Sequence, residues 1–374
     1  MNLDNKKRFL FYLVHPAKFH FHKIQINELI RRGHDVDIVI NTKDILEDLV
    51  KEEGLDYKNI FPKGRKIKGL HVYIAAVISI FITVYRLLIF TKGKKYDLFI
   101  GDLLSIIGII KGTPSLYPTD DVLSAVPEQV LFFKTVDNII APEITDLGKY
   151  KKKKISYIGY KALSHLHPNH FHPNINKLSK DLQNGEKYFV IRCTGFNATH
   201  DLNKSGISDT VLLKIINILE PHGKIFISSE RDLPNDLMKY NLKINKGDIS
   251  HYINYAEMFI SDSTTMSTEA AILGTPSIEF DEYFHEIDQM IELEKKYKLI
   301  NCFRTNDERG FLNKIIELSK KDDLKKVYKE RKNKLLNEMI DVSSFLIWLF
   351  ENYPNSIDEY YSDVNFQDKY KYNG

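Results

Sequence analysis

The sequence has only two cysteines in 374 residues, Cys193 and Cys302. They lie far apart and form no Cys-x-x-Cys pair, which excludes a disulfide framework and a cysteine-based zinc finger. So few cysteines are typical of a protein from a reducing compartment. The N-terminal apolar run, 9–14, ends at a His-Pro turn and is too short for a signal peptide. We therefore expect a cytoplasmic protein.

The chain also lacks a strong net charge. Its 53 lysines and arginines are almost balanced by 50 acidic residues, which leaves a net charge of +3. This charge is too small to attract nucleic acid through the overall field of the protein. No nucleic-acid partner is expected, and any anionic partner must be bound by a local group.

Apolar runs alternate with helical stretches through most of the sequence. This rhythm is typical of βαβ units and a parallel sheet. It predicts a Rossmann-like domain over 1–160 and a second one over 186–340, joined by a connector at 161–185 and followed by a C-terminal helix and tail at 341–374. The last twenty residues have too few aliphatic side chains to form an element of their own. The predicted strands are 9–14, 36–40, 97–101, 114–117, 138–141, 188–192, 224–228, 257–261 and 276–280.

Four histidines crowd the connector and suggest a metal site. Their spacing fits no standard zinc pattern, no cysteine is near, and two prolines break any helix that could align them. A hinge or cleft-lining role is favoured, and no metal site is predicted. The histidines are His165, His167, His170 and His172.

Two polar residues of the first domain directly follow predicted strands. His15 comes after the first strand and Asp102 after the run "DLFIG". Ligands of open parallel sheets bind beyond the carboxyl ends of the strands, so both residues are placed to line a cleft. The alternative has equal weight: His15 caps a loop and Asp102 caps a helix.

The segment 70–90 is long and apolar, with Arg86 as its one full charge. It is almost long enough to span a bilayer, which takes about 20 apolar residues, but a spanning helix would disrupt the predicted sheet. Two interpretations stay open: a helix lying on an anionic membrane surface, or a core helix that covers the sheet. The basic residues that flank the segment are Lys63, Arg65, Lys66, Lys68, Lys92, Lys94 and Lys95.

A hydroxyl-rich helix start stands in the second domain, in "FISDSTTMSTEAAILGTPSIEF". Asp262 and Ser263 occupy the N-cap positions, and the first turn follows them. The free N–H groups and the helix dipole favour an anion such as a diphosphate. Glu269 lies on the same face as Thr265, one turn later, where a carboxylate can accept hydrogen bonds from ribose hydroxyls. The segment predicts a nucleoside diphosphate pocket, and the alternative is an ordinary capped helix.

This segment resembles the diagnostic motif of a bacterial and archaeal family catalogued as domain of unknown function 354, within the superfamily of GT-B glycosyltransferases and epimerases. Four more stretches are similar in the same order: "HPAKFHFHK", "YIGYKALSHLHPNHFHP", "IRCTGFNATHD" and "GKIFISSERDLP". The resemblance implies a GT-B-like α/β fold with two Rossmann-like domains whose parallel sheets face across a cleft. It also implies that the second domain holds most of a nucleotide-sugar.

The resemblance assigns residues to both domains. In the first domain the family has an acidic Asp-Thr-Glu segment, where this chain has Thr119, Asp120 and Asp121, so the role of either aspartate is open. In the second domain the implied donor-side residues are Arg192, Asn197, His200, Ser228, Ser229, Glu230, Ser263, Thr264, Thr265 and Glu269.

The predicted activity is transfer of a sugar from a nucleotide-diphosphate donor, a UDP-sugar, in the biosynthesis of cell-surface glycan or polysaccharide. The catalytic base is expected among His15, Asp102, Asp120 and Asp121. The resemblance implies no metal and no other cofactor. The expected acceptor is a glycan or a lipid-linked group, and peripheral binding to the inner face of the cytoplasmic membrane is an alternative to a purely cytoplasmic location. Two further alternatives are a non-hydrolysing UDP-sugar 2-epimerase and a non-catalytic nucleotide-sugar-binding protein.

Overall fold

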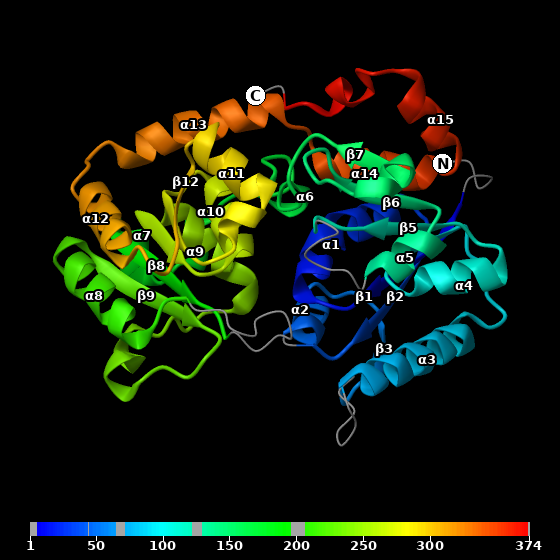
Figure 1. Ribbon diagram of the computed structural model, residues 1–374, viewed down its shortest axis with the longest axis horizontal. Coiled ribbons are helices and arrows are strands. Elements are labelled where there is room, and N and C mark those ends of the chain that lie inside the picture. Colours follow the sequence, from blue (N-terminus) through cyan, green and yellow to red (C-terminus); the bar gives the residue numbers. More distant parts are fainter. Residues whose placement is uncertain (1–5, 44, 65–71, 122–128, 196–205, 373–374) are drawn as a thin grey trace. The chain divides into compact units, whose positions relative to one another are not determined.

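The protein consists of two compact α/β units in the computed structural model (Figure 1). The structure describes residues 6–43, 45–64, 72–121, 129–195 and 206–372. Unit 1 contains Met1–His165 together with Ile340–Tyr372, and unit 2 contains Leu166–Met339. The C-terminal residues therefore return to the first unit.

Unit 1 is built on a seven-stranded sheet with the order β3-β2-β1-β4-β5-β6-β7. All of its strand pairs are parallel. The central strands are almost entirely buried, as expected when both faces of a parallel sheet are covered. The strands are β1 (Arg8–Leu13), β2 (Asp35–Asn41), β3 (Lys58–Phe61), β4 (Leu98–Gly101), β5 (Ser115–Pro118), β6 (Asn138–Pro142) and β7 (Lys154–Tyr157).

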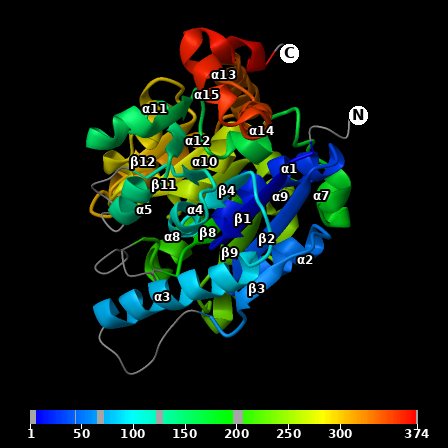
Figure 2. The ribbon, with the colours of Figure 1, turned by 90° about the vertical axis from the view of Figure 1, so that its right-hand side faces the viewer.

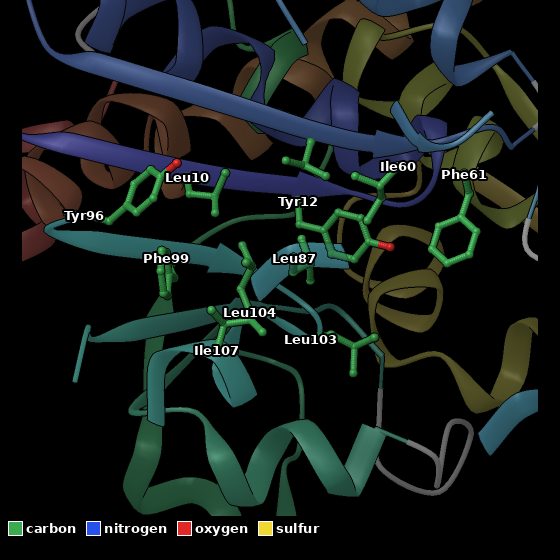
Figure 3. Packing of buried hydrophobic residues seen from close by; sticks show 11 residues of the cluster. Leu10, Tyr12, Ile60, Phe61, Leu87, Tyr96, Phe99, Leu103, Leu104 and Ile107 are labelled. Carbon is green, nitrogen blue, oxygen red and sulfur yellow. The ribbon is translucent and has the colours of Figure 1, made fainter. Parts of the chain in front are cut away.

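One hydrophobic cluster of unit 1 joins the sheet to helices α3 (Val72–Thr91) and α4 (Leu104–Lys111). Leu10 of β1 and Phe99 of β4 extend toward Leu87 and Ile107 of these helices (Figure 3). Packing of α3 on the sheet confirms the core-helix interpretation for one of its faces. The other helices of the first part of unit 1 are α1 (Pro16–Arg31), α2 (Leu46–Glu52), α5 (Val130–Thr135), the 3-10 helix η3 (Gly148–Lys153) and α6 (Leu163–Leu166).

The C-terminal segment forms α14 (Val342–Asn352), α15 (Asn355–Ser362) and the 3-10 helix η10 (Phe366–Tyr370). The prediction that the tail forms no element is therefore wrong. Aromatic side chains supply the apolar surface that aliphatic ones do not: the rings of Trp348 and Phe366 lie 4.3 Å apart. In addition, Tyr360 hydrogen-bonds Ser156 of β7, 2.7 Å between the hydroxyl oxygens.

Unit 2 is built on a five-stranded parallel sheet with the order β12-β11-β10-β8-β9. Two parallel sheets in two units confirm the predicted α/β class. The strands are β8 (Tyr188–Cys193), β9 (Lys224–Ser229), β10 (Met258–Ser261), β11 (Ser277–Phe280) and β12 (Ile300–Phe303). The α-helices are α7 (Lys180–Gln183), α8 (Asp209–Leu219), α9 (Ile249–Tyr255), α10 (Thr264–Leu273), α11 (Asp288–Lys295), α12 (Glu308–Ser319) and α13 (Leu324–Glu338). The 3-10 helices are η4 (Ile175–Lys177), η6 (Glu220–His222), η7 (Asn235–Tyr240), η8 (Lys246–Asp248) and η9 (Phe284–Glu286).

Candidate functional site

The strand order of unit 1 reverses between β1 and β4, which is where open α/β sheets bind ligands. Gly101 ends β4 with a φ of +137°, and a Cβ atom there would lie 2.7 Å from the carbonyl oxygen of Tyr12. A side chain at this position would therefore clash with β1. Glycine lets the chain pass beside β1 and places Asp102 at the carboxyl edge of the sheet.

Lys18, in the first turns of α1, forms an ion pair with Asp102 across this edge. Lys18 Nζ lies 3.9 Å from Asp102 Oδ1, and each side chain is 18% exposed. The same ammonium donates a hydrogen bond to the carbonyl oxygen of Pro118 and lies 5.1 Å from the ring centroid of Tyr117. Lys18 thus links the ends of β1, β4 and β5. Asp102 is not the N-cap of α4, which is Leu103, so the capping alternative for Asp102 is not realised.

A second lysine–carboxylate pair lies beside the first. Lys161, which follows β7, places Nζ 2.9 Å from Asp120 Oδ1. Burial by itself would raise the pKa of Asp120, but Lys161 and then Lys18 hold it below its ordinary value. Burial likewise opposes the charge of Lys161, yet Asp120 raises the pKa of that ammonium above its ordinary value, with smaller contributions from Asp121 and Asp102. Both members of this pair are therefore ionised at neutral pH.

The other two catalytic candidates make local contacts. Asp121 accepts a hydrogen bond from Gln129 Nε2 (2.6 Å), and its own N–H donates to Thr119 Oγ1 (3.2 Å). His15 is the N-cap of α1, and its Nδ1 accepts a hydrogen bond from the N–H of Ala17 (3.2 Å). His15 thus has a capping role, at the start of a helix where the alternative expected a loop, and a catalytic role for either residue stays a prediction.

In unit 2 the strand order reverses between β8 and β10. Arg192 of β8 donates from Nη1 to Ser228 Oγ of β9 (2.8 Å) and forms an ion pair with Glu230. Glu230 also accepts the N–H of Gly195 (3.2 Å). Three predicted donor-side residues therefore lie together at one edge of the sheet. Ser229 differs, because its hydroxyl bonds the backbone of Arg231.

Asp262 does not cap α10 as the sequence predicted. Its two carboxylate oxygens accept the N–H groups of Thr194 (2.8 Å) and Ile207 (3.0 Å). Burial raises the pKa of Asp262 to about 6, although these hydrogen bonds oppose the shift. The carboxylate thus binds the described backbone on both sides of residues 196–205. Asn197 and His200 lie within that segment, outside the described residues.

The N-cap of α10 is Ser263, and within the described residues its side chain makes no capping hydrogen bond. The first turn, with Thr264 half-buried and Thr265 exposed, therefore leaves its amide groups to another acceptor. Glu269 lies one turn further and is 8% exposed. An anion at this helix start is favoured by the dipole and the amides together.

Glu279, at the end of β11, lies beneath α10 and accepts a hydrogen bond from the hydroxyl of Ser267. Burial raises its pKa well above the ordinary value of a glutamic acid, which favours the neutral form of the side chain. A negative charge here would oppose an anion at the helix start. The raised pKa lowers the charge of the carboxyl group and so reduces that repulsion.

Sequence reasoning missed Lys18, Lys161 and Glu279. The two lysines stand in the quoted stretches "HPAKFHFHK", which also contains Lys23, and "YIGYKALSHLHPNHFHP", among aromatic and histidine residues. That contrast was a usable signal. Nothing in the sequence marks Glu279, because its importance depends on burial.

The connector histidines do not form a metal centre in the part of the chain that the structure describes, where no group of three or more His, Cys, Asp or Glu side chains is arranged to hold a metal ion. His165 and His167 are buried instead. The ring of His165 lies 5.3 Å from that of His20, between centroids.

Comparisons with known proteins relate the chain to a family and a fold. The model of a family described as "Protein of unknown function (DUF354)" matches residues 17–343. No curated protein matches.

Solved structures share the fold over most of the chain. They include CalG4, the calicheamicin glycosyltransferase (10% identity, TM-score 0.57, 96% of this chain and 99% of that one). A UDP-N-acetylglucosamine 2-epimerase is similar at 12% identity and a TM-score of 0.58, over 89% of this chain and 95% of that one. MnaA of S. aureus, in a co-structure with UDP, is similar at 10% identity and a TM-score of 0.62, over 88% of this chain and 95% of that one. At these identities the likeness shows the GT-B fold alone.

Proposed function

The chain belongs to the family of unknown function DUF354, and from this premise we propose that it is a GT-B-type glycosyltransferase with a UDP-sugar as donor. The observation that carries the proposal is the edge of the unit 2 sheet, where Arg192, Ser228 and the start of α10 gather. A guanidinium and a helix start with free amides are the groups that neutralise a departing diphosphate. UDP in the co-structure of MnaA supports the choice of nucleotide.

Unit 1 supplies the groups for proton transfer in this proposal. Transfer requires a base that deprotonates the acceptor hydroxyl. Asp102 and Asp120 each lie beside a lysine, and an ionised carboxylate at the carboxyl edge can accept that proton. The lysines hold the carboxylates in place and keep the local charge balanced.

A second candidate function, epimerisation of a UDP-sugar, is favoured by the two lysine–carboxylate pairs. Elimination and re-addition of the nucleotide need an acid and a base around one sugar ring, and an ammonium beside a carboxylate supplies both. Incubation with UDP-sugars alone separates the two reactions. Transfer predicts UDP release only after an acceptor is added, whereas an epimerised nucleotide-sugar without acceptor would establish the second function. UDP binding without either reaction would indicate a non-catalytic binding protein.

Glu269 tests the donor site directly. If its carboxylate accepts the ribose hydroxyls, Glu269→Ala should weaken UDP binding by about 1.5 to 3 kcal/mol, the cost of losing a charge-assisted hydrogen bond. Isothermal titration with UDP measures this, and Glu330→Ala, at an exposed position of α13, is the matched control. Equal affinities of wild type and Glu269→Ala would remove Glu269 from the site, and no UDP binding by wild type would refute the proposal.

The proposal extends to the conditions of the reaction. The diphosphate is held by Arg192 and α10 without a divalent ion, so EDTA should leave turnover unchanged; activity lost in EDTA and restored by Mg²⁺ would contradict this. The acceptor is a glycan or a lipid-linked group of cell-surface polysaccharide biosynthesis, which the apolar helix α3 supports. The free cysteines Cys193 and Cys302 are in keeping with a cytoplasmic location.

A further inference from the structure

Helix α3 turns an apolar face outward. Five side chains at helical spacing of three and four residues expose 52% to 70% of their surface. A helix that faces water normally carries polar side chains at such positions. We call this set the α3 stripe: Ile74, Val77, Phe81, Tyr85 and Ile89.

The opposite face of α3 is buried and contains hydroxyl groups. Thr83 and Thr91 are fully buried, and each donates to the carbonyl oxygen four residues earlier, Thr83 to Ser79 (2.6 Å) and Thr91 to Leu87 (2.9 Å). Leu87 on this face belongs to the core cluster. Ile80, Val84 and Leu88 of α3 also pack against this cluster. Helix α3 is thus apolar on both faces, and the core of unit 1 does not use the α3 stripe.

The neighbouring helix α4 also exposes apolar side chains. Helix α4 packs against α3 and exposes Ile109 (64%) and Ile110 (58%). Lys111 at the end of α4 donates to the carbonyl of Thr91 at the end of α3, which fixes the two helices to each other. Both views place α3 at the outer edge of unit 1 (Figures 1 and 2). Exposed apolar surface of this kind marks an interaction site.

The charge around the α3 stripe indicates the partner. No acidic residue occurs in 70–95, and the exposed Lys92 and Lys95 follow the helix directly. The single charge within α3, Arg86, is engaged by the carbonyl of Ile60 and the ring of Phe61. In the sequence, four further basic residues stand at 63–68. An apolar face with basic residues at both ends is complementary to an anionic lipid surface.

Two other uses of this face fit less well. A two-fold dimer through α3 would bring the basic ends of two copies together in either helix orientation, and such contacts between like charges are unfavourable. Helix α3 is long and apolar enough to cross a membrane by length and composition. Crossing would, however, withdraw Leu87 from the core cluster and expose Leu10 and Phe99 to water.

We propose that unit 1 binds reversibly to an anionic bilayer surface through the α3 stripe, with Lys92 and Lys95 against the lipid headgroups. The apolar side chains enter the interface between headgroups and acyl chains, and α3 stays packed on its sheet. This inference does not depend on the proposed donor or reaction, because it rests on the α3 stripe and on the lysines that follow it, and on no residue of the candidate site.

Vesicle cosedimentation of the full chain tests the proposal. Wild type should bind vesicles that contain phosphatidylserine at low salt, bind pure phosphatidylcholine vesicles at least tenfold more weakly, and dissociate at high salt as the charges are screened. The double variant Phe81→Glu/Tyr85→Glu should bind at least tenfold more weakly. Lys92→Gln/Lys95→Gln should lose about as much, since each lysine near an anionic surface contributes roughly fivefold.

Two matched variants keep the test specific. Val364→Glu puts one glutamate, half the charge added by the double variant, at a fully exposed apolar residue outside α3. Lys151→Gln/Lys152→Gln removes two exposed lysines of η3. Both should bind like wild type. Equal losses in the η3 variant would show general charge attraction and overturn the assignment to α3. Three other results would also overturn the proposal. They are wild type that stays in solution with anionic vesicles, wild type that stays bound to the vesicles at high salt, and a dimer in sedimentation that Phe81→Glu/Tyr85→Glu dissociates. Unchanged thermal unfolding of each variant establishes that its fold is intact.

Discussion

The carboxyl edges of the two sheets are built from different groups. The edge of unit 1 carries paired side-chain charges, with Asp120 held ionised beside Lys161. The edge of unit 2 also has one ion pair, Arg192–Glu230, in which the glutamate is half exposed. Beside it lie a helix start and hydroxyls, and the buried carboxyls Asp262 and Glu279 have raised pKa values. Side-chain acids and bases can move protons, whereas fixed amides stabilise a phosphate without exchanging one. In the proposed function, unit 1 therefore supplies the groups for proton transfer and unit 2 those that bind the diphosphate.

The largest expected effect concerns turnover. Asp120→Asn removes the ionised carboxylate beside Lys161, and we expect kcat to fall by about 10²- to 10⁴-fold, the usual contribution of a positioned acid or base. Asp121→Asn is the matched control, because the hydrogen bonds of Asp121 within the described residues join it to Gln129 and Thr119 and its effect on Lys161 is smaller than that of Asp120; its kcat should fall less than tenfold. Steady-state kinetics with the identified donor measures both. Equal losses of kcat in the two variants would show that the contact with Lys161 does not give Asp120 a special role in turnover.

The next effect is on stability as a function of pH. Burial raises the pKa of Asp262 from 3.8 to about 6, so between these values the folded state binds a proton that the unfolded state has released. The free energy of unfolding should therefore fall as pH rises through this window, by at most about 3 kcal/mol at about 1.4 kcal/mol per pKa unit.

Denaturant unfolding at pH 4 to 7 measures this dependence, and Asp262→Asn should remove it. The variant is expected to be less stable throughout, because an amide cannot accept both the Thr194 and the Ile207 N–H groups. Asp120→Asn should remove a dependence of the opposite sign. The pKa of the Asp120 carboxyl group is lowered in the folded protein, so its contribution to the free energy of unfolding is present above the ordinary pKa of an aspartate and is lost as pH falls. Parallel curves for wild type and Asp262→Asn would contradict the assignment.

The smallest effect is on nucleotide affinity. Arg192→Gln should weaken UDP binding by about 1.5 to 3 kcal/mol, because a charge-assisted contact to the diphosphate is lost. Lys18→Gln in unit 1 should change the Kd of UDP less than threefold while it lowers turnover. Isothermal titration on both variants checks this. Equal weakening would show that the nucleotide is bound by both units.

The strands that the sequence missed share a position in the sheets. β3 and β7 are the edge strands of the first sheet, and β12 is an edge strand of the second. Edge strands are covered less completely, so they lack the continuous apolar run that marks a buried parallel strand. β3 begins with Lys58 and Asn59, and β7 begins at the end of a lysine run. The inner strands, by contrast, were all predicted.

At the candidate sites, sequence reasoning placed residues at the right ends of strands but could not assign their partners. Arg192, Ser228 and Glu230 do lie together. Asp262 was expected to cap α10, because the residue before a helix usually does so. Instead it bonds the backbone at Thr194 and Ile207, which are 68 and 55 residues away in the chain.

The sequence by itself determined the local features of this protein: the buried inner strands, the hydroxyl-rich start of α10 and the apolar composition of α3. These follow from periodicity and residue type over a few turns of chain. Only the tertiary structure decided that Lys18 meets Asp102, that Lys161 meets Asp120, and which face of α3 is exposed. It also decided the opposite pKa shifts of Asp120 and Asp262. The physical reason is that a contact between distant residues depends on strand order, and the charge state of a carboxyl group depends on its burial and on the charges that the fold brings near it.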